Sequence, residues 1–225
     1  MTTSTDRNRS GGIPGWTLWV AAAVVVVVIL VVAVLFSKDS GSSAEPEAWD
    51  EGAPVTVTGE ALPPLPDDVG GLVEDPAVDA AIGRTVPTLA GTDARTGEPV
   101  ELAPTPGKGR ILLVMAHWCP HCQAEVPRIV EHLAESPLPD DVELVGLATR
   151  LAPGENNYPS SAWLAREDWT APTLIDDANT TAGVAVGLSG LPFFIVTDAE
   201  GTVVARASGE LTTEGFDHLV ELAQG

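Results

Sequence analysis

The stretch Ile111-Leu112-Leu113-Val114-Met115-Ala116-His117-Trp118-Cys119-Pro120-His121-Cys122 decides the fold of this chain. Its first half is an unbroken apolar run, which is typical of a strand buried on both faces of a sheet. After Cys122, apolar side chains recur at helical spacing, at positions 126, 129, 130 and 133. The stretch therefore predicts a buried strand that turns directly into a helix, with the chain's only two cysteines at the turn.

The two cysteines are spaced for dithiol–disulfide exchange. We expect Cys119 at the N-terminus of the helix, where free N–H groups and the helix dipole favour a thiolate. Cys122 follows one turn later, close enough to attack a mixed disulfide formed on Cys119. The pair thus supplies a nucleophile and a resolving thiol. Because the cysteines carry the electrons themselves, we expect no organic cofactor.

Three other roles for a cysteine pair fit this sequence less well. A structural zinc site needs about four ligands, and His117, His132 and His218 do not supply a second pair at the usual spacing. A purely structural disulfide would close a very small loop and would constrain the unfolded chain little. Two unpaired buried thiols would leave the Pro-His dipeptide between them without a role. We therefore expect a redox pair and no bound metal.

The pentapeptide Trp118-Cys119-Pro120-His121-Cys122 resembles the active site of thioredoxin-fold proteins, and its Pro-His dipeptide resembles the periplasmic, DsbA-like disulfide oxidases. The continuation Cys122-Gln123-Ala124-Glu125-Val126-Pro127 is more similar to the membrane-tethered TlpA/ResA group, which carries Glu and Pro at these offsets. The resemblance extends from about Ile82 to the C-terminus. It implies an α/β thioredoxin-like fold over residues 80–225, in which helices flank a central mixed β-sheet that carries a TlpA-type insertion. It also implies the activity of a protein thiol–disulfide oxidoreductase.

The resemblance further assigns the residues that face the cysteines. Proline opens the apolar strand at Gly190-Leu191-Pro192, where it need not donate to the ladder. By resemblance Pro192 is a cis-proline whose backbone edge, together with Leu191, binds substrate, although an ordinary trans-proline is the commoner state of such bonds. We expect Trp118 to shield the site and to contribute to the same substrate-binding surface.

The sequence departs from the family pattern at Leu113. Thioredoxins and the disulfide oxidases carry an acid there, six residues before the first cysteine, which handles the proton of the resolving thiol. Glu125, three residues after Cys122 on the same helix face, is the candidate replacement, and a solvated surface acid is the alternative. His121 as a cation would stabilise the Cys119 thiolate, whereas a neutral ring would only cover the site, and a helix N-terminus disfavours the cation.

The N-terminal third predicts a membrane anchor. Residues 1–15 are polar and form the expected cytoplasmic tail. Residues 16–36 carry no charge, and a helix of 21 residues would span about 31 Å, which matches a hydrocarbon core of about 30 Å. Arg7 and Arg9 precede this span, so the positive-inside rule places the N-terminus in the cytoplasm and the rest of the chain outside the cell membrane. The alternative is a cleavable signal peptide cut near Ser42-Ser43-Ala44, although its apolar core would be unusually long.

Residues 37–79 are rich in Ser, Gly, Pro and acidic side chains, a composition that predicts a disordered, extended tether. Within it, residues 55–58 could form a short strand. The whole chain is acidic, with 11 basic against 32 acidic residues and a net charge of −21, which argues against nucleic acid as a partner. We expect as partners extracytoplasmic proteins with thiols or disulfides, and a membrane redox protein that recharges a monomeric soluble domain.

Two other functions remain open at this stage. A copper-handling module would use Cys119 and Cys122 with a third soft or imidazole ligand that only the fold could supply. A thiol peroxidase of the peroxiredoxin type would need Thr or Ser three residues before the reactive cysteine, where this chain has Ala116. The direction of exchange also stays open, with the Pro-His dipeptide favouring oxidation or isomerisation and the Glu125-Val126-Pro127 context favouring reduction.

Overall fold

The apolar run forms β5 (Gly109–Met115), in which every residue is buried, at the centre of a nine-stranded mixed sheet. The computed structural model describes residues 52–66 and 69–225, so the predicted tail, the predicted membrane span and the first part of the predicted linker lie outside these residues. Within these ranges no helix has the length and apolar character needed to cross a membrane. The other strands are β1 (Thr56–Thr58), β2 (Gly71–Val73), β3 (Thr88–Asp93), β4 (Pro99–Leu102), β6 (Val142–Ala148), β7 (Thr173–Ile175), β8 (Phe193–Thr197) and β9 (Val203–Ser208). The helices are α2 (Pro120–Glu135), α3 (Ser160–Arg166), α4 (Thr181–Ala185) and α5 (Thr213–Gln224).

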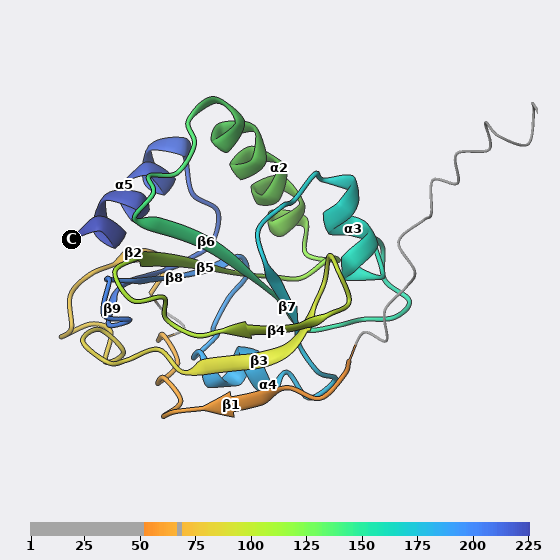
Figure 1. The fold of residues 1–225 in the computed structure, drawn as a ribbon, viewed down its shortest axis with the longest axis horizontal. Helices are drawn as coiled ribbons and strands as arrows, with labels where there is room; N and C mark the ends of the chain where they lie inside the picture. Colours follow the sequence, from red (N-terminus) through yellow and green to blue (C-terminus); the bar gives the residue numbers. More distant parts are fainter. Residues whose placement is uncertain (1–51, 67–68) are drawn as a thin grey trace, which may run out of the picture. The chain divides into compact units, whose positions relative to one another are not determined.

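The sheet follows the order β1-β3-β7-β6-β5-β8-β9-β2, and β4 pairs with β3 (Figure 1). β5 runs parallel to β6 and antiparallel to β8, so the predicted mixed sheet is confirmed. β3 and β4 pair antiparallel and form a hairpin before the central strand.

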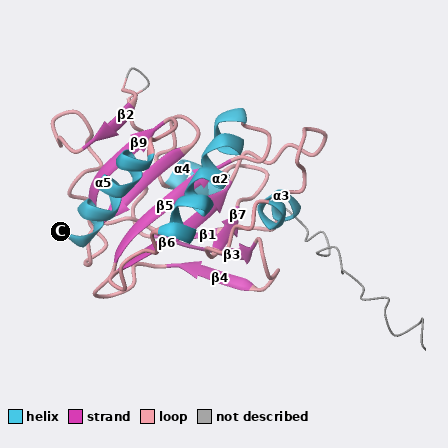
Figure 2. Cartoon of the chain, turned by 90° about the horizontal axis from the view of Figure 1, so that it is seen from above, coloured by secondary structure: helices cyan, strands magenta, loops and turns pink. Residues whose placement is uncertain are grey.

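Alternate side chains of β5 enter two separate cores. Ile111, Leu113 and Met115 belong to the core beneath α2, α3 and α5. Leu112 and Val114 belong to the core that includes residues of α4. Helices therefore cover both faces of the sheet, as Figures 1 and 2 show.

The predicted helices form close to their expected positions. α2 begins directly after Cys119 and continues through Pro127 to Glu135. α5 begins after Thr212, whose side chain accepts a hydrogen bond from the Gly215 N–H at 3.1 Å. Thr212 therefore provides the N-terminal cap of this helix.

The prediction that residues 37–79 form a disordered tether is wrong for the part that the structure describes. β1 pairs with β3 and β2 pairs with β9, both antiparallel. Leu62 and Leu65, within the Pro-rich run, are buried in the core on the α4 face. The polar composition of this segment gave no sign that these two leucines are buried, because the side chains that bury them come from distant parts of the chain. The folded unit thus begins well before the predicted boundary at residue 80, and β1 confirms the short strand expected at 55–58.

A buried ion pair fixes this N-terminal segment to the sheet. Arg206 of β9 donates from Nε to Asp79 Oδ2 at 2.7 Å and from Nη2 to Asp79 Oδ1, and both side chains are fully buried. Its Nη1 donates to the carbonyls of Pro63 at 3.0 Å and Val186 at 3.3 Å. Fork geometry of this kind satisfies the guanidinium without water. Asp79 was assigned to the linker by sequence, and it belongs to the folded unit instead.

Candidate active site

The two cysteines lie at the predicted strand-to-helix turn. Cys119 is the N-cap residue of α2 and Pro120 follows at the first helical position, where its missing N–H costs nothing. The thiols are not bonded to each other in this structure. Cys119 keeps 5% of its surface exposed and Cys122 keeps none. Cys119 is therefore the more accessible sulfur, as predicted, although both residues are buried.

The environment of Cys122 keeps its thiol protonated. Burial raises the pKa of Cys122 far above the ordinary thiol value, and the nearby Cys119 and Glu125 add to the increase, while a backbone hydrogen bond from Ala116 opposes it. A group with this pKa cannot attack a disulfide at neutral pH until a base has accepted its proton.

A cis peptide bond joins Leu191 to Pro192, as the resemblance implied. β8 pairs antiparallel with β5, with Phe193 opposite Val114, and this pairing brings Pro192 to the cysteine turn. The Cys119 Sγ lies 3.9 Å from the Leu191 carbonyl oxygen, to which its S–H can donate weakly. The Leu191–Pro192 edge therefore borders the accessible cysteine, which is the arrangement that the predicted substrate-binding role requires.

The loop over residues 150–158 is hydrogen-bonded to the two residues that precede Cys119. The Trp118 Nε1–H donates to the Arg150 carbonyl at 2.7 Å. His117 is fully buried; its Nδ1 lies 2.8 Å from the Asn156 carbonyl oxygen and its Nε2 accepts from the Ala152 N–H at 3.3 Å. These contacts assign the neutral tautomer protonated at Nδ1. They hold the Trp118 and His117 side chains against this loop. The shielding role of Trp118 stays a prediction, and no pattern in the sequence indicated His117.

Glu125 is a buried acid rather than a solvated one. Only 1% of its side chain is exposed, and its Oε2 accepts from Arg128 Nη1 at 2.6 Å and from the Leu211 N–H at 3.2 Å. Burial raises the pKa of Glu125, and the Arg128 charge and the Leu211 N–H only partly offset this. A carboxyl group with a raised pKa one turn from Cys122 is suited to exchange a proton with it.

His121 lies at the surface, with 68% of its side chain exposed. Its Nδ1 is 2.6 Å from Oε1 of Glu210, which lies between β9 and α5. Oε2 of the same carboxylate accepts from Arg128 Nη2 at 2.8 Å. Sequence reasoning missed Glu210, because no local pattern connects it with His121, 89 positions away in the chain. It also missed Arg128, although the i,i+3 spacing from Glu125 could have indicated that ion pair.

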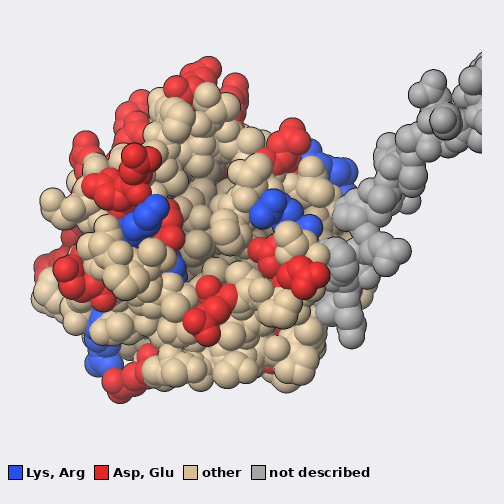
Figure 3. All heavy atoms as spheres, in the orientation of Figure 1, with Lys and Arg blue, Asp and Glu red and all other residues tan. Residues whose placement is uncertain are grey.

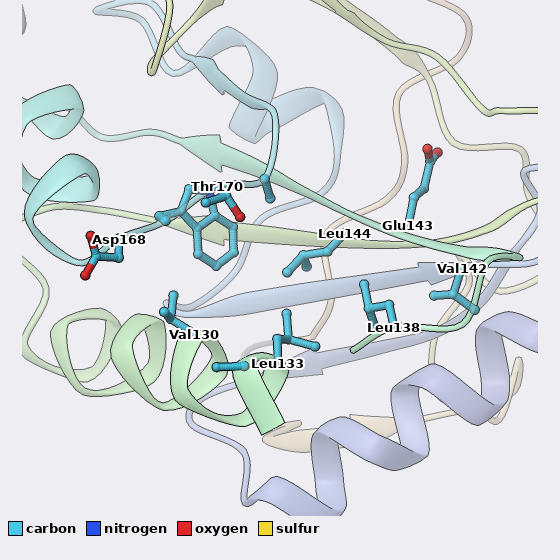
Figure 4. Close-up of a pocket in the computed structure, with 11 residues that line it drawn as sticks. Val130, Leu133, Leu138, Val142, Glu143, Leu144, Asp168 and Thr170 are labelled. Atoms are coloured by element: carbon cyan, nitrogen blue, oxygen red, sulfur yellow. The ribbon is translucent and has the colours of Figure 1, made fainter. Parts of the chain in front are cut away.

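Two further surface features lie apart from the cysteines. A cavity of about 510 Å³ lies between the second half of α2, β6 and the loop after α3, and its lining includes Leu133, Leu144 and Trp169. Figure 4 shows the side chains that line it. Figure 3 shows Asp and Glu side chains scattered over one face, with few basic ones between them. In the part of the chain that the structure describes, no group of three or more His, Cys, Asp or Glu side chains could hold a metal ion.

This sheet, with a cysteine pair at the start of a helix and a cis-proline beside it, defines a thioredoxin-like protein. The chain belongs to the Redoxin family, whose profile matches residues 81–220. It is 31% identical over 152 residues to the probable thiol:disulfide interchange protein DsbE-2 of Pasteurella multocida, covering 66% of this chain and 76% of the relative. The thiol:disulfide interchange protein DsbE of Vibrio cholerae is 28% identical over 138 residues, covering 60% and 69% of the two chains.

A crystal structure of a thioredoxin-family thiol:disulfide interchange protein from Chlorobium tepidum superposes with a TM-score of 0.52 at 25% identity. The match covers 63% of this chain and 96% of that one. The protein is thus a thiol–disulfide oxidoreductase of thioredoxin-like fold, and its substrates are thiols and disulfides.

Proposed function

We propose that this protein exchanges disulfides with extracytoplasmic proteins through Cys119 and Cys122, from a membrane anchor of the TlpA/ResA type. One observation carries the proposal: the more accessible Cys119 caps α2 beside the Leu191–Pro192 edge, and the fully buried Cys122 lies one turn behind it. The chemistry needs no organic cofactor and no metal, since the two sulfurs hold the two electrons that move.

In the reducing direction, the Cys119 thiolate attacks a substrate disulfide and releases one substrate sulfur as a thiolate, which leaves a mixed disulfide on Cys119. Cys122 then loses its proton and attacks Cys119 Sγ. The Cys119–Cys122 bond forms, the second substrate thiolate leaves, and the substrate has gained two electrons. The oxidising direction is the exact reverse, and the redox partner that recharges the pair decides which direction operates.

Glu125 is the proposed acceptor of the Cys122 proton. The buried thiol has a strongly raised pKa, so it needs a base close by in a site from which water is largely excluded. Glu125 is buried on the same helix face and influences Cys122 electrostatically. In this proposal Glu125 takes the role of the acid that thioredoxins carry at the position of Leu113.

His121 and the Pro192 edge have supporting roles in this proposal. The Leu191–Pro192 backbone, with Trp118 nearby, receives the substrate segment that carries the target sulfur. His121 lies in the first turn of α2 and contributes positive charge near Cys119 only while it is protonated. Its Nδ1 lies 2.6 Å from the carboxylate of Glu210.

Disulfide trapping tests the roles of the cysteines. Cys122→Ser should accumulate mixed disulfides with partner proteins, because nothing resolves the bond on Cys119, whereas Cys119→Ser should accumulate few. Non-reducing gels followed by mass spectrometry measure both. Equal trapping by the two variants, or the reverse order, refutes the assignment. Copper titration of the reduced protein, set against reduction of insulin, discriminates the copper-handling alternative.

The proposed location rests on residues 16–36 as the anchor, residues 1–15 as the cytoplasmic tail and everything after residue 36 as extracytoplasmic. Single cysteines introduced at Ser4 and Ser43, in a Cys119→Ser/Cys122→Ser background, test this topology. An impermeant maleimide should label only the second position on intact cells. Labelling at Ser4 refutes the topology, and an N-terminus starting near Glu45 in the membrane-extracted protein would establish cleavage instead.

A further inference from the structure

Two carboxylates share one guanidinium beside the cysteine pair. Arg128 Nη1 donates to Glu125 Oε2 at 2.6 Å, and Arg128 Nη2 donates to Glu210 Oε2 at 2.8 Å. Nη1 also donates to the Leu211 carbonyl, which anchors the guanidinium independently of either acid. The two acids therefore compete for a single positive charge whose position is fixed by the backbone.

The two carboxylates differ in burial. The Glu125 side chain is 1% exposed and the Glu210 side chain is 35% exposed. Water solvates Glu210 whatever its partners do, whereas Glu125 depends on Arg128 and the Leu211 N–H to carry a charge. Glu210 in turn raises the pKa of Glu125 by repulsion, in addition to the larger effect of burial. The charge on the exposed acid thus affects the ionisation of the buried one.

Two histidines of α2 and one further carboxylate lie near this cluster. On α2, His121 Nδ1 lies 2.6 Å from Glu210 Oε1, so this carboxylate is shared with the first turn of the helix beside Cys119. Farther along α2, His132 lines a cavity of about 10 Å³ together with Glu125 and Arg128. His132 has its own partner on α5, since its Nε2 lies 2.7 Å from Asp217 Oδ1.

We infer that Glu210 is a positioning residue for the dithiol, acting through Arg128: it competes with Glu125 for the guanidinium and so sets the charge of that buried carboxylate. This inference rests on the proposed function, in which Glu125 accepts the Cys122 proton. His121 is a further partner of the Glu210 carboxylate, since its Nδ1 lies 2.6 Å from Oε1. The Glu210 carboxylate therefore contacts both the first turn of α2, beside Cys119, and the guanidinium that binds Glu125.

Opposite effects from two substitutions make the inference testable. Glu210→Gln keeps a hydrogen-bond acceptor for Arg128 but removes the competing charge, so the Glu125 carboxyl should titrate at lower pH. Arg128→Gln removes the charge that stabilises the Glu125 carboxylate, so the same carboxyl should titrate at higher pH. We expect shifts of at least about threefold in proton affinity, or roughly half a pH unit.

The experiment uses the full reduced chain with carbon-13 in the glutamate carboxyl groups, and the Glu125 signal is assigned by its loss in Glu125→Gln. Asp217→Asn is the matched control, because it removes the charge of another carboxylate that contacts a histidine of α2. The pH profile for resolution of a glutathione mixed disulfide on Cys119 is measured in parallel and should move with the Glu125 midpoint. Glu210→Ala serves as the second variant if the glutamine disturbs folding.

Each outcome decides the inference. Midpoints that move down in Glu210→Gln, up in Arg128→Gln and not at all in Asp217→Asn support it, provided the resolution profile follows. A midpoint in Glu210→Gln that matches wild type or Asp217→Asn overturns it while leaving the proposed function intact. A wild-type protein that never resolves the mixed disulfide refutes the proposed function, and with it this role for Glu210.

Discussion

Two arginine–carboxylate clusters, one on each face of the sheet, differ in burial and in charge balance. Arg206 and Asp79 are both fully buried, carry one charge each and leave the guanidinium donors paired. Arg128 is partly exposed and faces two carboxylates, one buried and one at the surface. The first cluster is charge-balanced, whereas the second carries an excess acid whose ionisation can change.

The difference separates a structural role from a functional one. Removing one partner of a fully buried pair leaves an uncompensated charge in a region of low polarity, so the fold depends on both partners. In the Arg128 cluster, Glu210 is 35% exposed and also contacts His121, so it does not depend on the guanidinium alone. Under the proposed function this cluster takes part in proton transfer, whereas the Arg206–Asp79 pair stabilises the fold.

The largest effect should come from the buried pair. Asp79→Asn should lower the free energy of unfolding by about 3–5 kcal/mol, because it leaves the Arg206 guanidinium buried without a counter-charge. Urea denaturation measures the loss, and the remaining folded protein should exchange disulfides at the wild-type rate. The control is Arg84→Gln, which breaks the exposed Arg84–Glu60 pair at 4.0 Å and should cost less than about 1 kcal/mol. Equal losses in the two variants would mean that burial does not distinguish these pairs.

The next effect concerns Glu125. Glu125→Gln should slow resolution of a mixed disulfide by about 100-fold at neutral pH, the lower range for loss of a general acid–base group. Stopped-flow measurement of the resolution rate tests this. Glu131→Gln, which changes an exposed acid on the same helix, should leave the rate unchanged. A Glu125→Gln variant with the wild-type rate would remove Glu125 from the mechanism.

The same variant has a defined effect on stability. The folded state raises the pKa of Glu125 above its unfolded value, so the folded state binds this proton more tightly. The contribution of Glu125 to stability is therefore complete below the unfolded pKa and decreases as pH rises toward the folded pKa. Unfolding measured from pH 4 to 8 should show this decrease in wild type and not in Glu125→Gln.

The smallest effect should come from the segment that holds Glu210. Thr212→Ala removes the cap of α5 two residues after Glu210 and should cost about 1 kcal/mol in the free energy of unfolding. Hydrogen exchange should show the loss of protection in the first turn of α5 and none around Asp79. Thr213→Ala changes the adjacent residue, which is not the cap, and should cost clearly less. A larger cost for Thr213→Ala than for Thr212→Ala would mean that Thr213, and not Thr212, caps the helix.

Local patterns in the sequence predicted most of the fold. The apolar run of β5, the helical spacing after Cys122 and the proline at the start of β8 each reflect burial or backbone geometry over a few residues, and all three elements form where expected. The position of Cys119 at the helix start followed from the same stretches, whereas the cis bond before Pro192 was implied only by the family resemblance.

The rest depends on contacts that only the folded chain creates. Glu210 reaches His121 and Arg128 because the chain segment between β9 and α5 passes beside α2, and no spacing in the sequence encodes this approach. Likewise, Asp79 and Arg206 lie 127 positions apart. Composition identified residues 37–79 as polar and Pro-rich, but it could not show that two leucines and one aspartate within them have partners in the sheet.

The two short N-terminal strands have a consequence for aggregation. β1 covers the backbone of Thr88–Ala90 in β3, and β2 covers Arg206–Ser208 on the outer side of β9. A chain shortened to residue 80 would expose both stretches as open edges, where N–H and C=O groups can recruit a strand from another molecule. The same shortening would remove the counter-charge of Arg206. Proteolysis that removed the residues before position 80 would thus leave an oxidoreductase that is prone to edge-to-edge association.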